Sequence, residues 1–254
     1  SERLEGGTPM TKHVLLDNIT HKDLRIRPGY GRGMGCEVNV ARVFPIEFTQ
    51  LQMEYPIVLM RNRESGHFEP IVLFGFAEAE NLFVTDDGWD ARYVPLTILR
   101  QPFLIGFQES FEAGVPQRTP VVHVDLDHPK VSMLDGEPVF LEHGGESELL
   151  ERMTSILMTI NEGAQANETF SKLLVGLDLV EPSTMEFVFD NGEKHTLGGL
   201  FIVNEERLRG LNGAALETLH EHGYLQAIYM MLASMPNFRR LVDRKNRAAQ
   251  AVSG

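Results

Sequence analysis

One candidate for chemistry is a short segment in which histidine and aspartate alternate. It reads HVDLDHP over residues 123–129. On a β-strand, His123 and Asp125 point the same way because the side-chain period is two. A His-x-Asp pair with a distant histidine is the ligand pattern of non-haem iron oxygenases. His195 is the candidate third ligand, and Arg207 is a candidate clamp for a co-substrate carboxylate. One alternative function is therefore an Fe(II)- and 2-oxoacid-dependent oxygenase.

The same segment also fits a structural interpretation, which we favour. Residues 127–129 have the composition of an ordinary turn after a strand. The chain contains nine histidines, so a pairing of this kind is easily found by chance. We therefore expect no bound metal and no other cofactor. His123, Asp125 and His195 are metal ligands only in the oxygenase alternative.

A second candidate site surrounds the only tryptophan of the chain, Trp89, which lies in an acidic turn. A tryptophan can bury most of its rings while its N–H reaches a carboxylate or carbonyl. In the structural interpretation, Trp89 anchors the turn and Asp90 caps a short helix predicted over residues 91–101. In the alternative, the segment binds a ligand or a partner. The residues of that candidate site are Asp86, Trp89, Asp90, Arg92 and Tyr93.

The cysteine and the methionines are better explained as packing residues than as catalytic ones. Cys36 is the only cysteine, and its local sequence offers no base to activate it, so we predict a buried thiol. Several methionines fall in predicted helices, where they fill core space or form an adaptable groove for a partner helix or hydrophobic peptide. This set comprises Met153, Met158, Met230, Met231 and Met235.

Short apolar runs predict antiparallel strands in the first half of the chain. The runs are 38–48, 56–62, 70–76, 102–107 and 120–126. Residues 63–69 read as a hairpin connection between two of them. No long segment suited to a βαβ crossover separates the runs, so hairpins are expected.

The second half is predominantly helical by its periodicity. Apolar residues recur at spacings of three and four after Ser147, the expected N-cap, with a bend or break near Gly163. Residues 183–203 predict a hairpin with Asn191-Gly192 at its tip and Phe187 and Phe189 on the buried face. The tail from residue 204 predicts short helices.

Composition limits the classes of partner. The formal net charge of −13 argues against nucleic acid and anionic lipid as partners. No apolar run approaches the roughly 20 residues of a membrane span. The first residues contain no signal-peptide core, so a cytoplasmic protein is expected. We divide the chain into an expression scar (1–9), a basic N-terminal arm (10–38) that could contact a sister subunit, and one compact domain (39–254).

Several segments together resemble the bacterial SapC family. They include FPIEFTQLQMEYPIVLM, ENLFVTDDGWDARYVPLTILRQPFLIG and GGLFIVNEERLRGL, and the similarity runs in order from about Val43 to Leu241. The family name comes from a surface-layer (S-layer) setting. Genes for members often lie beside those for TonB-dependent receptors and for halogenase-like and cupin-like proteins. The resemblance therefore implies an accessory role near an uptake or modification system, and it carries over no catalytic residue.

These observations lead to one set of expectations. The fold should be α+β, with antiparallel sheets from the N-terminal half packed against helices mainly from the C-terminal half. The leading function is a non-enzymatic binding or accessory protein of the SapC family, with a protein or peptide partner, and self-association into a homo-oligomer is compatible with it. The rival functions are the oxygenase and a surface-layer component.

Overall fold

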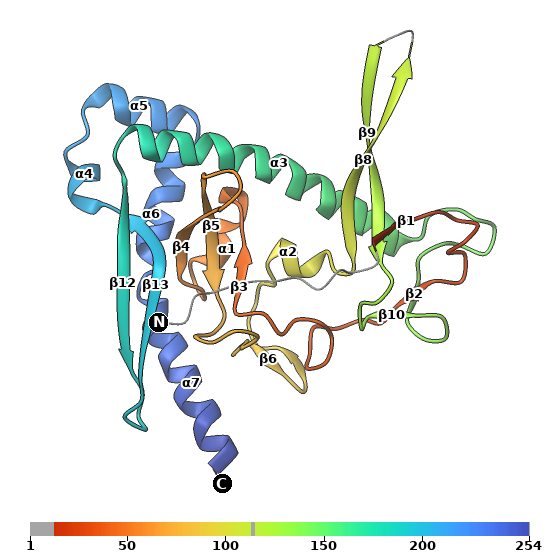
Figure 1. Cartoon of the computed structure of the whole chain (residues 1–254), viewed down its shortest axis with the longest axis horizontal. Helices are drawn as coiled ribbons and strands as arrows, with labels where there is room; N and C mark the ends of the chain where they lie inside the picture. The colour runs from red at the N-terminus through yellow and green to blue at the C-terminus, as the bar shows by residue number, and fades with distance from the viewer. Residues whose placement is uncertain (1–12, 113–114, 254) are drawn as a thin grey trace.

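The long helix α3 (Glu148–Gly176) links the two hydrophobic clusters of the molecule in the computed structural model, which describes residues 13–112 and 115–253 (Figure 1). It begins at the predicted N-cap, where the Ser147 side chain accepts a hydrogen bond from the Leu150 N–H over 3.2 Å. Met153 in its first half packs in the smaller cluster, and Phe170 in its second half packs in the larger one.

The helix is continuous through Gly163, so the predicted break is wrong. A Cβ atom at this position would lie 2.6 Å from the ring of Phe44, well inside van der Waals contact. The glycine therefore allows close packing between the helix and the segment that carries Phe44. A helical glycine can serve packing as readily as a bend, and the sequence alone does not separate the two.

The larger cluster lies against a five-stranded antiparallel sheet. Its strands, in spatial order, are β12 (Val180–Val188), β13 (Lys194–Val203), β4 (Ile57–Arg61), β5 (Phe68–Leu73) and β3 (Val40–Arg42). The predicted hairpin connection between β4 and β5 is confirmed. The sheet thus joins strands from both halves of the chain.

The predicted hairpin at 183–203 is confirmed as β12 and β13. Gly192 has φ +82°, which its lack of a side chain permits, and it lies in the turn between Val188 and Lys194. Phe189 is buried and Phe187 is half-buried, and both rings contact Phe76 with centroids 5.1 Å apart. The predicted inward face is therefore correct.

The apolar run 38–48 forms less strand than predicted. Only β3 is extended, and it is followed by a 3-10 helix, η1 (Pro45–Glu47), and by α1 (Phe48–Leu51). Pro45 has no N–H to continue a ladder, and the carboxylate of Glu47 accepts a hydrogen bond from the Phe44 N–H over 3.1 Å. The alternation in this segment reflects a turn that is buried on one side.

A second sheet contains the predicted hairpin of β8 (Phe103–Glu112) and β9 (Val115–Asp125), which projects beside the N-terminal part of α3 (Figure 1). Residues of the predicted N-terminal arm join this end of the molecule. β1 (His13–Leu15) pairs with β9, and β2 (Arg25–Ile26) pairs with β10 (Val131–Ser132) and β11 (Glu137–Pro138). A two-stranded turn, β6 (Val84–Thr85) and β7 (Gly88–Trp89), precedes the short helix α2 (Leu96–Leu99).

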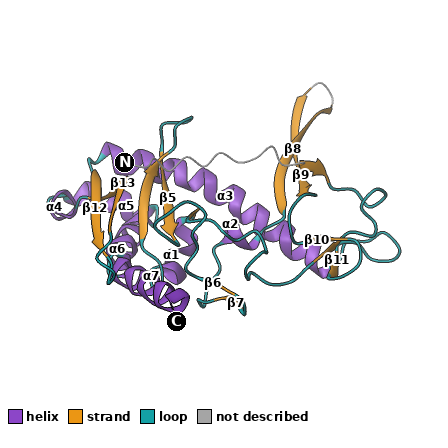
Figure 2. Ribbon diagram, turned by 60° about the horizontal axis from the view of Figure 1, so that its bottom comes forward, coloured by secondary structure: helices purple, strands orange, loops and turns teal. Residues whose placement is uncertain are grey.

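Four helices follow the second hairpin, and Figure 2 shows them with α3 around the five-stranded sheet. They are α4 (Glu205–Arg209), α5 (Gly213–Glu221), α6 (Tyr224–Ser234) and α7 (Asn237–Ser253). Asn204 and Asn212 cap α4 and α5, and Gly223, at φ +73°, separates α5 from α6. The expected α+β fold is confirmed. Among the described helices, none is long and apolar enough to cross a membrane.

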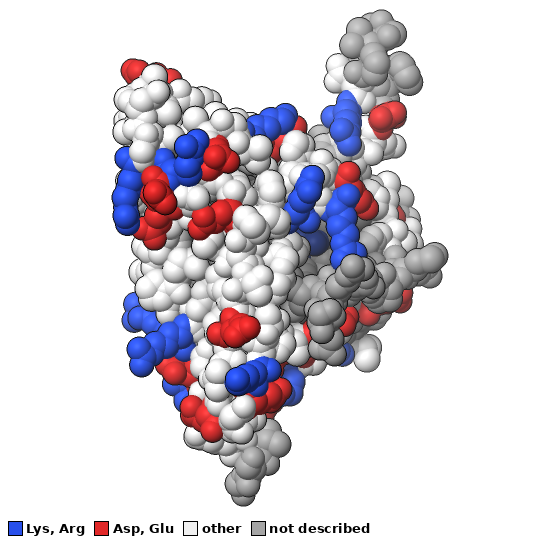
Figure 3. All heavy atoms as spheres, turned by 60° about the vertical axis from the view of Figure 1, so that its left-hand side comes forward, with Lys and Arg blue, Asp and Glu red and all other residues white. Residues whose placement is uncertain are grey.

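Charged side chains of both signs lie close together on the face shown in Figure 3, around an area of uncharged residues. Exposed ion pairs of the molecule include that of Arg209 with Glu205 and that of Arg207 with Asp178. A polyanion such as nucleic acid is bound by a concentrated basic surface, which this face does not present.

Candidate functional site

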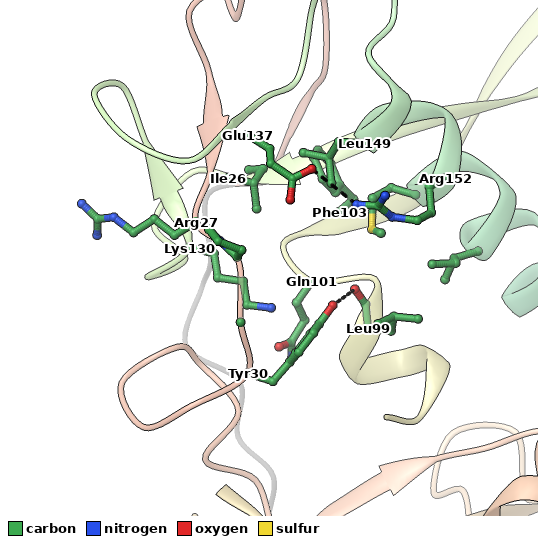
Figure 4. Close-up of a pocket in the computed structure, with 14 residues that line it drawn as sticks. Ile26, Arg27, Tyr30, Leu99, Gln101, Phe103, Lys130, Glu137, Leu149 and Arg152 are labelled. Carbon is green, nitrogen blue, oxygen red and sulfur yellow. Dashed lines mark hydrogen bonds and ion pairs between the residues drawn. The ribbon is translucent and has the colours of Figure 1, made fainter. Parts of the chain in front are cut away.

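A small cavity of about 200 Å³ lies beside the N-terminal half of α3, at the end of the molecule that contains β2 (Figure 4). Its apolar wall is formed mainly by Ile26, Leu99, Phe103, Leu149, Met153 and Ile156. Its polar lining is formed by Arg27, Tyr30, Gln101, Lys130, Glu137 and Arg152. A mostly apolar cavity with a few converging polar groups is the usual form of a ligand site.

Lys130 is the central group of this cavity because it is a buried cation, with only 2% of its surface exposed. The backbone holds it in the turn after β9. Its N–H donates to Nδ1 of His128 over 3.2 Å, and its carbonyl accepts the N–H of Arg27 over 2.8 Å. Burial lowers the pKa of its amine to about 8. Among the described residues, no carboxylate pairs with Nζ.

The nearest stabilising group for Lys130 is an aromatic face. Its Nζ lies 3.5 Å from the centroid of the Tyr30 ring, which is cation–π geometry. The Tyr30 hydroxyl donates to the carbonyl of Leu99 over 3.3 Å, which fixes the ring. Burial raises the pKa of Tyr30 to about 12, so the phenol stays protonated at neutral pH. Tyr30 therefore provides a π face and not a base.

Gln101 contributes a buried acceptor. Within the described part of the chain its Oε1 has no hydrogen-bond partner, and Figure 4 shows the side chain beside Tyr30. Buried polar atoms are rarely left unpaired without a reason. The cavity thus brings together a cation without an anion and an amide oxygen without a donor.

The rim of the cavity is charged. Arg152 and Glu137 face each other with Nη2 and Oε2 3.6 Å apart, and about half of each side chain is exposed. Arg27 turns away from the cavity and pairs with Asp135 over 3.0 Å (Figure 4). A ligand inside would therefore meet Lys130 in the interior and Arg152 at the rim.

Cys36 is not poised for catalysis. It is fully buried, which confirms the prediction of a buried thiol. Burial raises the pKa of the thiol to about 11, so the thiolate, which is the reactive form, is scarce at neutral pH. The chemistry of this cavity therefore rests on an amine, which can bind an anion or react as a neutral nucleophile.

The segment around Trp89 forms a hydrogen-bonded network. The indole N–H of Trp89 donates to the hydroxyl of Tyr55 over 2.8 Å, and that hydroxyl donates to the carbonyl of Tyr93 over 2.6 Å. The Tyr93 hydroxyl donates to Oε1 of Glu47 over 3.1 Å. The predicted amphipathic placement of Trp89 agrees with the structure, with a hydroxyl as its partner.

Glu47 is the member of this network that sequence reasoning missed. It is only 2% exposed, and its carboxylate also accepts the N–H of Leu96 over 2.8 Å. Burial raises the pKa of Glu47 to about 7, against the opposing effect of its hydrogen bonds. Leu96 is the first residue of α2, and Pro95 at the N-cap position has no capping side chain. The predicted capping of this helix by Asp90 is therefore wrong.

Asp90 instead connects the turn to the C-terminal helix. Its carboxylate pairs with Nη1 of Arg244 in α7 over 2.5 Å, and its carbonyl accepts a hydrogen bond from Nη2 over 2.8 Å. The guanidinium carbon of Arg244 lies 4.2 Å from the centroid of the Phe83 ring. Asp90 thus takes part in a tertiary contact.

The other two residues of the predicted site lie at the surface. Asp86 pairs with Arg32 over 2.8 Å, and both side chains are mostly exposed. Arg92 has an exposed side chain, and its backbone N–H donates to the carboxylate of Glu54 over 2.9 Å. The structure thus gathers Trp89 and Tyr93 into one part-buried network and leaves the side chain of Arg92 exposed.

The three residues of the oxygenase alternative lie in two different sheets. His123 and Asp125 are on β9, beside β1 and β8, and His195 is on β13 of the five-stranded sheet. The ring of His195 packs against Phe76, with centroids 5.8 Å apart. Among the residues whose side chains the structure describes, no group of three His, Cys, Asp or Glu could hold a metal ion.

Some residues of the predicted methionine set lie in the core, and some line a groove at the surface. Met153 and Met231 are buried, as core filling requires. Met231 and Met235 also line a groove of about 270 Å³ between α6 and β13. The core-filling interpretation is thus correct for Met153 and Met231, and the role of the groove in binding a partner stays a prediction.

Fold and cavity together define an α+β protein with a buried lysine at a small, mostly apolar cavity. The model of the SapC family matches residues 16–241, so the chain belongs to the SapC family. The match includes the residues of the cavity and those of the Trp89 network. Among curated proteins and among solved structures, no match to this chain was found.

Proposed function

We propose that this SapC-family protein is a non-enzymatic binding protein with an accessory role, and that its Lys130 cavity receives a carboxylate-bearing ligand. The observation that carries the proposal is that Lys130 is only 2% exposed and that its ammonium has no carboxylate partner among the described residues. An anion bound in the cavity would supply that partner.

The energetic argument concerns the burial of charge. An ammonium removed from water without a counter-ion costs several kcal/mol. A cation–π contact such as that with Tyr30 returns only about 0.5–2 kcal/mol. The remaining cost favours a bound anion, because a charge-assisted hydrogen bond between Nζ and a carboxylate would compensate the buried charge.

The cavity fits a carboxylate better than a more highly charged anion. It has one interior cation, and the carboxylate of Glu137 at the rim would repel a doubly charged group. Phe103 and Met153 offer an apolar wall for a short hydrocarbon part. The volume of about 200 Å³ suits a small group. The carboxylate can belong to a free organic acid or to the end of a peptide.

The proposal extends to the setting that the family resemblance implies, in which members assist an outer-membrane uptake system or a protein- or peptide-modification system. A protein or peptide partner is part of this proposal. Capture of a peptide by its terminal carboxylate would be one way in which a chain of this kind could assist such a system.

The test is isothermal titration calorimetry with propionate, butyrate and benzoate, and with a short peptide whose C-terminus is free or amidated. Loss of a charge-assisted hydrogen bond weakens binding by about 10–100-fold, so Lys130→Met should bind that much more weakly than the wild type. Lys172→Met is the matched control, because Lys172 is exposed and pairs with Glu168. Free and amidated peptides distinguish the two sources of carboxylate.

Two results would overturn the proposal. One is that none of these ligands shows saturable binding to the wild-type protein. The other is that Lys130→Met binds them as tightly as Lys172→Met does. Circular dichroism of both variants checks that the fold is kept.

A further inference from the structure

We infer that Lys130 captures short 2-oxo acids covalently, by forming a Schiff base between its Nζ and the carbonyl carbon of the ligand. The inference rests on the proposed function, since it assigns a ligand class to the same cavity. It goes further because it gives the amine a chemical role in addition to an electrostatic one.

The position of the amine supports this role. Figure 4 shows the end of the Lys130 side chain directed into the cavity, above Tyr30 and Gln101. The Tyr30 ring covers one side of Nζ at 3.5 Å. Among the described residues, no hydrogen-bond acceptor holds the amine, so its neutral form has a lone pair free to attack a carbonyl group.

The protonation state supports the same role. A lysine is an effective nucleophile when an apolar environment lowers its pKa, because the neutral amine is the reacting form. With a pKa of about 8, roughly a tenth of the Lys130 amine is neutral at pH 7. An amine at the ordinary value of 10.5 is neutral to less than about one part in a thousand at that pH.

A comparison with other lysines shows why Lys130 differs. Lys172 donates to Glu168 over 2.6 Å on an exposed helix face. Lys245 pairs with Glu80. In both cases a carboxylate pairs with the ammonium, whereas at Lys130 burial disfavours the charged form of the amine and lowers its pKa.

The chemistry of the ligand follows from the two properties of the site. A carboxylate is attracted to the unpaired ammonium, and in a 2-oxo acid the carbonyl carbon is bonded directly to that carboxylate. Binding therefore brings the electrophile close to Nζ. Arg152 at the rim offers a second cation for the carboxylate, and the apolar wall accommodates a short side chain.

The proposed step is a reversible condensation that needs no oxidant or reductant. The Nζ lone pair attacks the carbonyl carbon, a C–N bond forms, and the π electron pair moves to oxygen, which takes up a proton. The nitrogen gives up one proton to solvent, which completes the carbinolamine. The hydroxyl group then leaves as water with a proton supplied by solvent, and the second nitrogen proton passes to solvent as the C=N bond forms. The products are one imine and one water molecule.

The experiment is reductive trapping with glyoxylate or pyruvate and sodium cyanoborohydride at pH 7, followed by peptide mapping in a mass spectrometer. We expect a single main adduct at Lys130, formed at least about tenfold faster than any adduct at Lys172 in the same molecule. This internal comparison uses the wild-type protein, so it does not depend on the folding of a variant. Lys130→Arg should abolish the main adduct, and Lys172→Arg should leave it unchanged.

Labelling of Lys130 no faster than that of Lys172 would overturn the inference. The calorimetric test with propionate, which has a carboxylate but no reactive carbonyl, is independent of this result. If propionate binds and Lys130 is not trapped, the covalent step is wrong and the binding function stands. If neither occurs, both are wrong.

Discussion

The indole N–H of Trp89 donates a hydrogen bond to the hydroxyl of Tyr55 over 2.8 Å, and Tyr55 is fully buried. The same hydroxyl donates to the carbonyl of Tyr93 over 2.6 Å. The Tyr55 hydroxyl therefore forms hydrogen bonds with two segments: the turn that contains Trp89 and the segment that leads into α2. The tryptophan connects an acidic surface turn to the larger hydrophobic cluster, which explains why it lies between aspartates.

Tyr55→Phe should lower the free energy of unfolding by about 1–3 kcal/mol, because it leaves a part-buried N–H and a carbonyl without their partner. Urea unfolding followed by the fluorescence of Trp89, the only tryptophan, measures the change. Tyr229→Phe is the control, since Tyr229 is 55% exposed, and it should change stability by less than about 0.5 kcal/mol. Equal effects of the two substitutions would contradict the structural role of the network.

Arg244 and Asp90 should contribute unequally to stability although they form one ion pair. Asp90→Ala should cost only about 0.5–1 kcal/mol, because 62% of its side chain is exposed. Arg244→Ala should cost more, about 1–3 kcal/mol, since it also loses the hydrogen bond to the Asp90 carbonyl and the packing on Phe83. Thermal or urea unfolding of both variants gives the ranking.

Asp86→Ala provides the surface reference for that ranking. Its pair with Arg32 is mostly exposed on both sides, so its loss should change stability by less than about 0.5 kcal/mol. If Asp90→Ala lowers the free energy of unfolding at least as much as Arg244→Ala does, the contacts of Arg244 with the Asp90 carbonyl and with Phe83 do not contribute the expected stability.

Local signals made parts of this fold predictable. The side chain of Ser147 caps the N–H three residues ahead, and the turn with Gly192 joins strands that are adjacent in sequence. Both features depend on a few neighbouring residues. The predicted inward face of Phe187 is correct for the same reason. Its depth was not predictable, because α7 covers it through Phe238, with ring centroids 5.6 Å apart.

The candidate cavity was not predictable, because its chemistry comes from contacts between distant segments. Lys130 follows a proline in a polar turn, where a solvated lysine is the ordinary expectation. Its burial comes from the folded chain, in which it lies against Tyr30, a hundred positions earlier in the sequence. The role of Glu47 was not predictable for the same reason, since its carboxylate accepts the N–H of Leu96 across a separation of 49 residues.

Gly163→Ala should destabilise the protein by about 1–3 kcal/mol, although alanine is the better helix former by roughly 1 kcal/mol. The reason is the ring of Phe44, which lies 2.6 Å from the position of the new Cβ. Gly176→Ala is the matched control at the end of the same helix, because nothing lies within 4 Å of its Cβ position. It should be neutral or stabilise by up to about 1 kcal/mol. Chemical denaturation of both variants decides whether packing or propensity dominates.

Glu47 should make the protein less stable as the pH rises from about 4.5 to 7. Burial raises the pKa of its carboxyl to about 7, above the value of 4.5 expected in the unfolded chain. Between these values the folded protein retains a proton that the unfolded chain has released, so its relative stability falls as pH increases. The shift corresponds to roughly 2–3 kcal/mol.

Glu47→Gln tests this effect because it has nearly the same shape and does not titrate. The stability of the wild type minus that of Glu47→Gln should fall by roughly 2–3 kcal/mol between pH 4 and pH 8. Urea unfolding at several pH values measures both proteins under the same conditions. A difference that stays constant over this range would show that Glu47 does not titrate with a raised pKa.

Lys130→Met should stabilise the protein at pH 7, because it replaces a buried ammonium by an apolar side chain of similar length. Burial lowers the pKa of Lys130 from 10.5 to about 8. The unfolded chain therefore holds more protons than the folded one between these values, and wild-type stability rises with pH there. We expect the variant to exceed the wild type by roughly 2–3 kcal/mol at pH 7 and by much less at pH 10. A saturating carboxylate ligand should narrow the gap at pH 7, since it binds only the folded wild type and supplies the missing anion. Urea unfolding with and without propionate measures both effects. If the stability difference between Lys130→Met and the wild type is the same at pH 10 as at pH 7, Lys130 is not a buried charge with a lowered pKa.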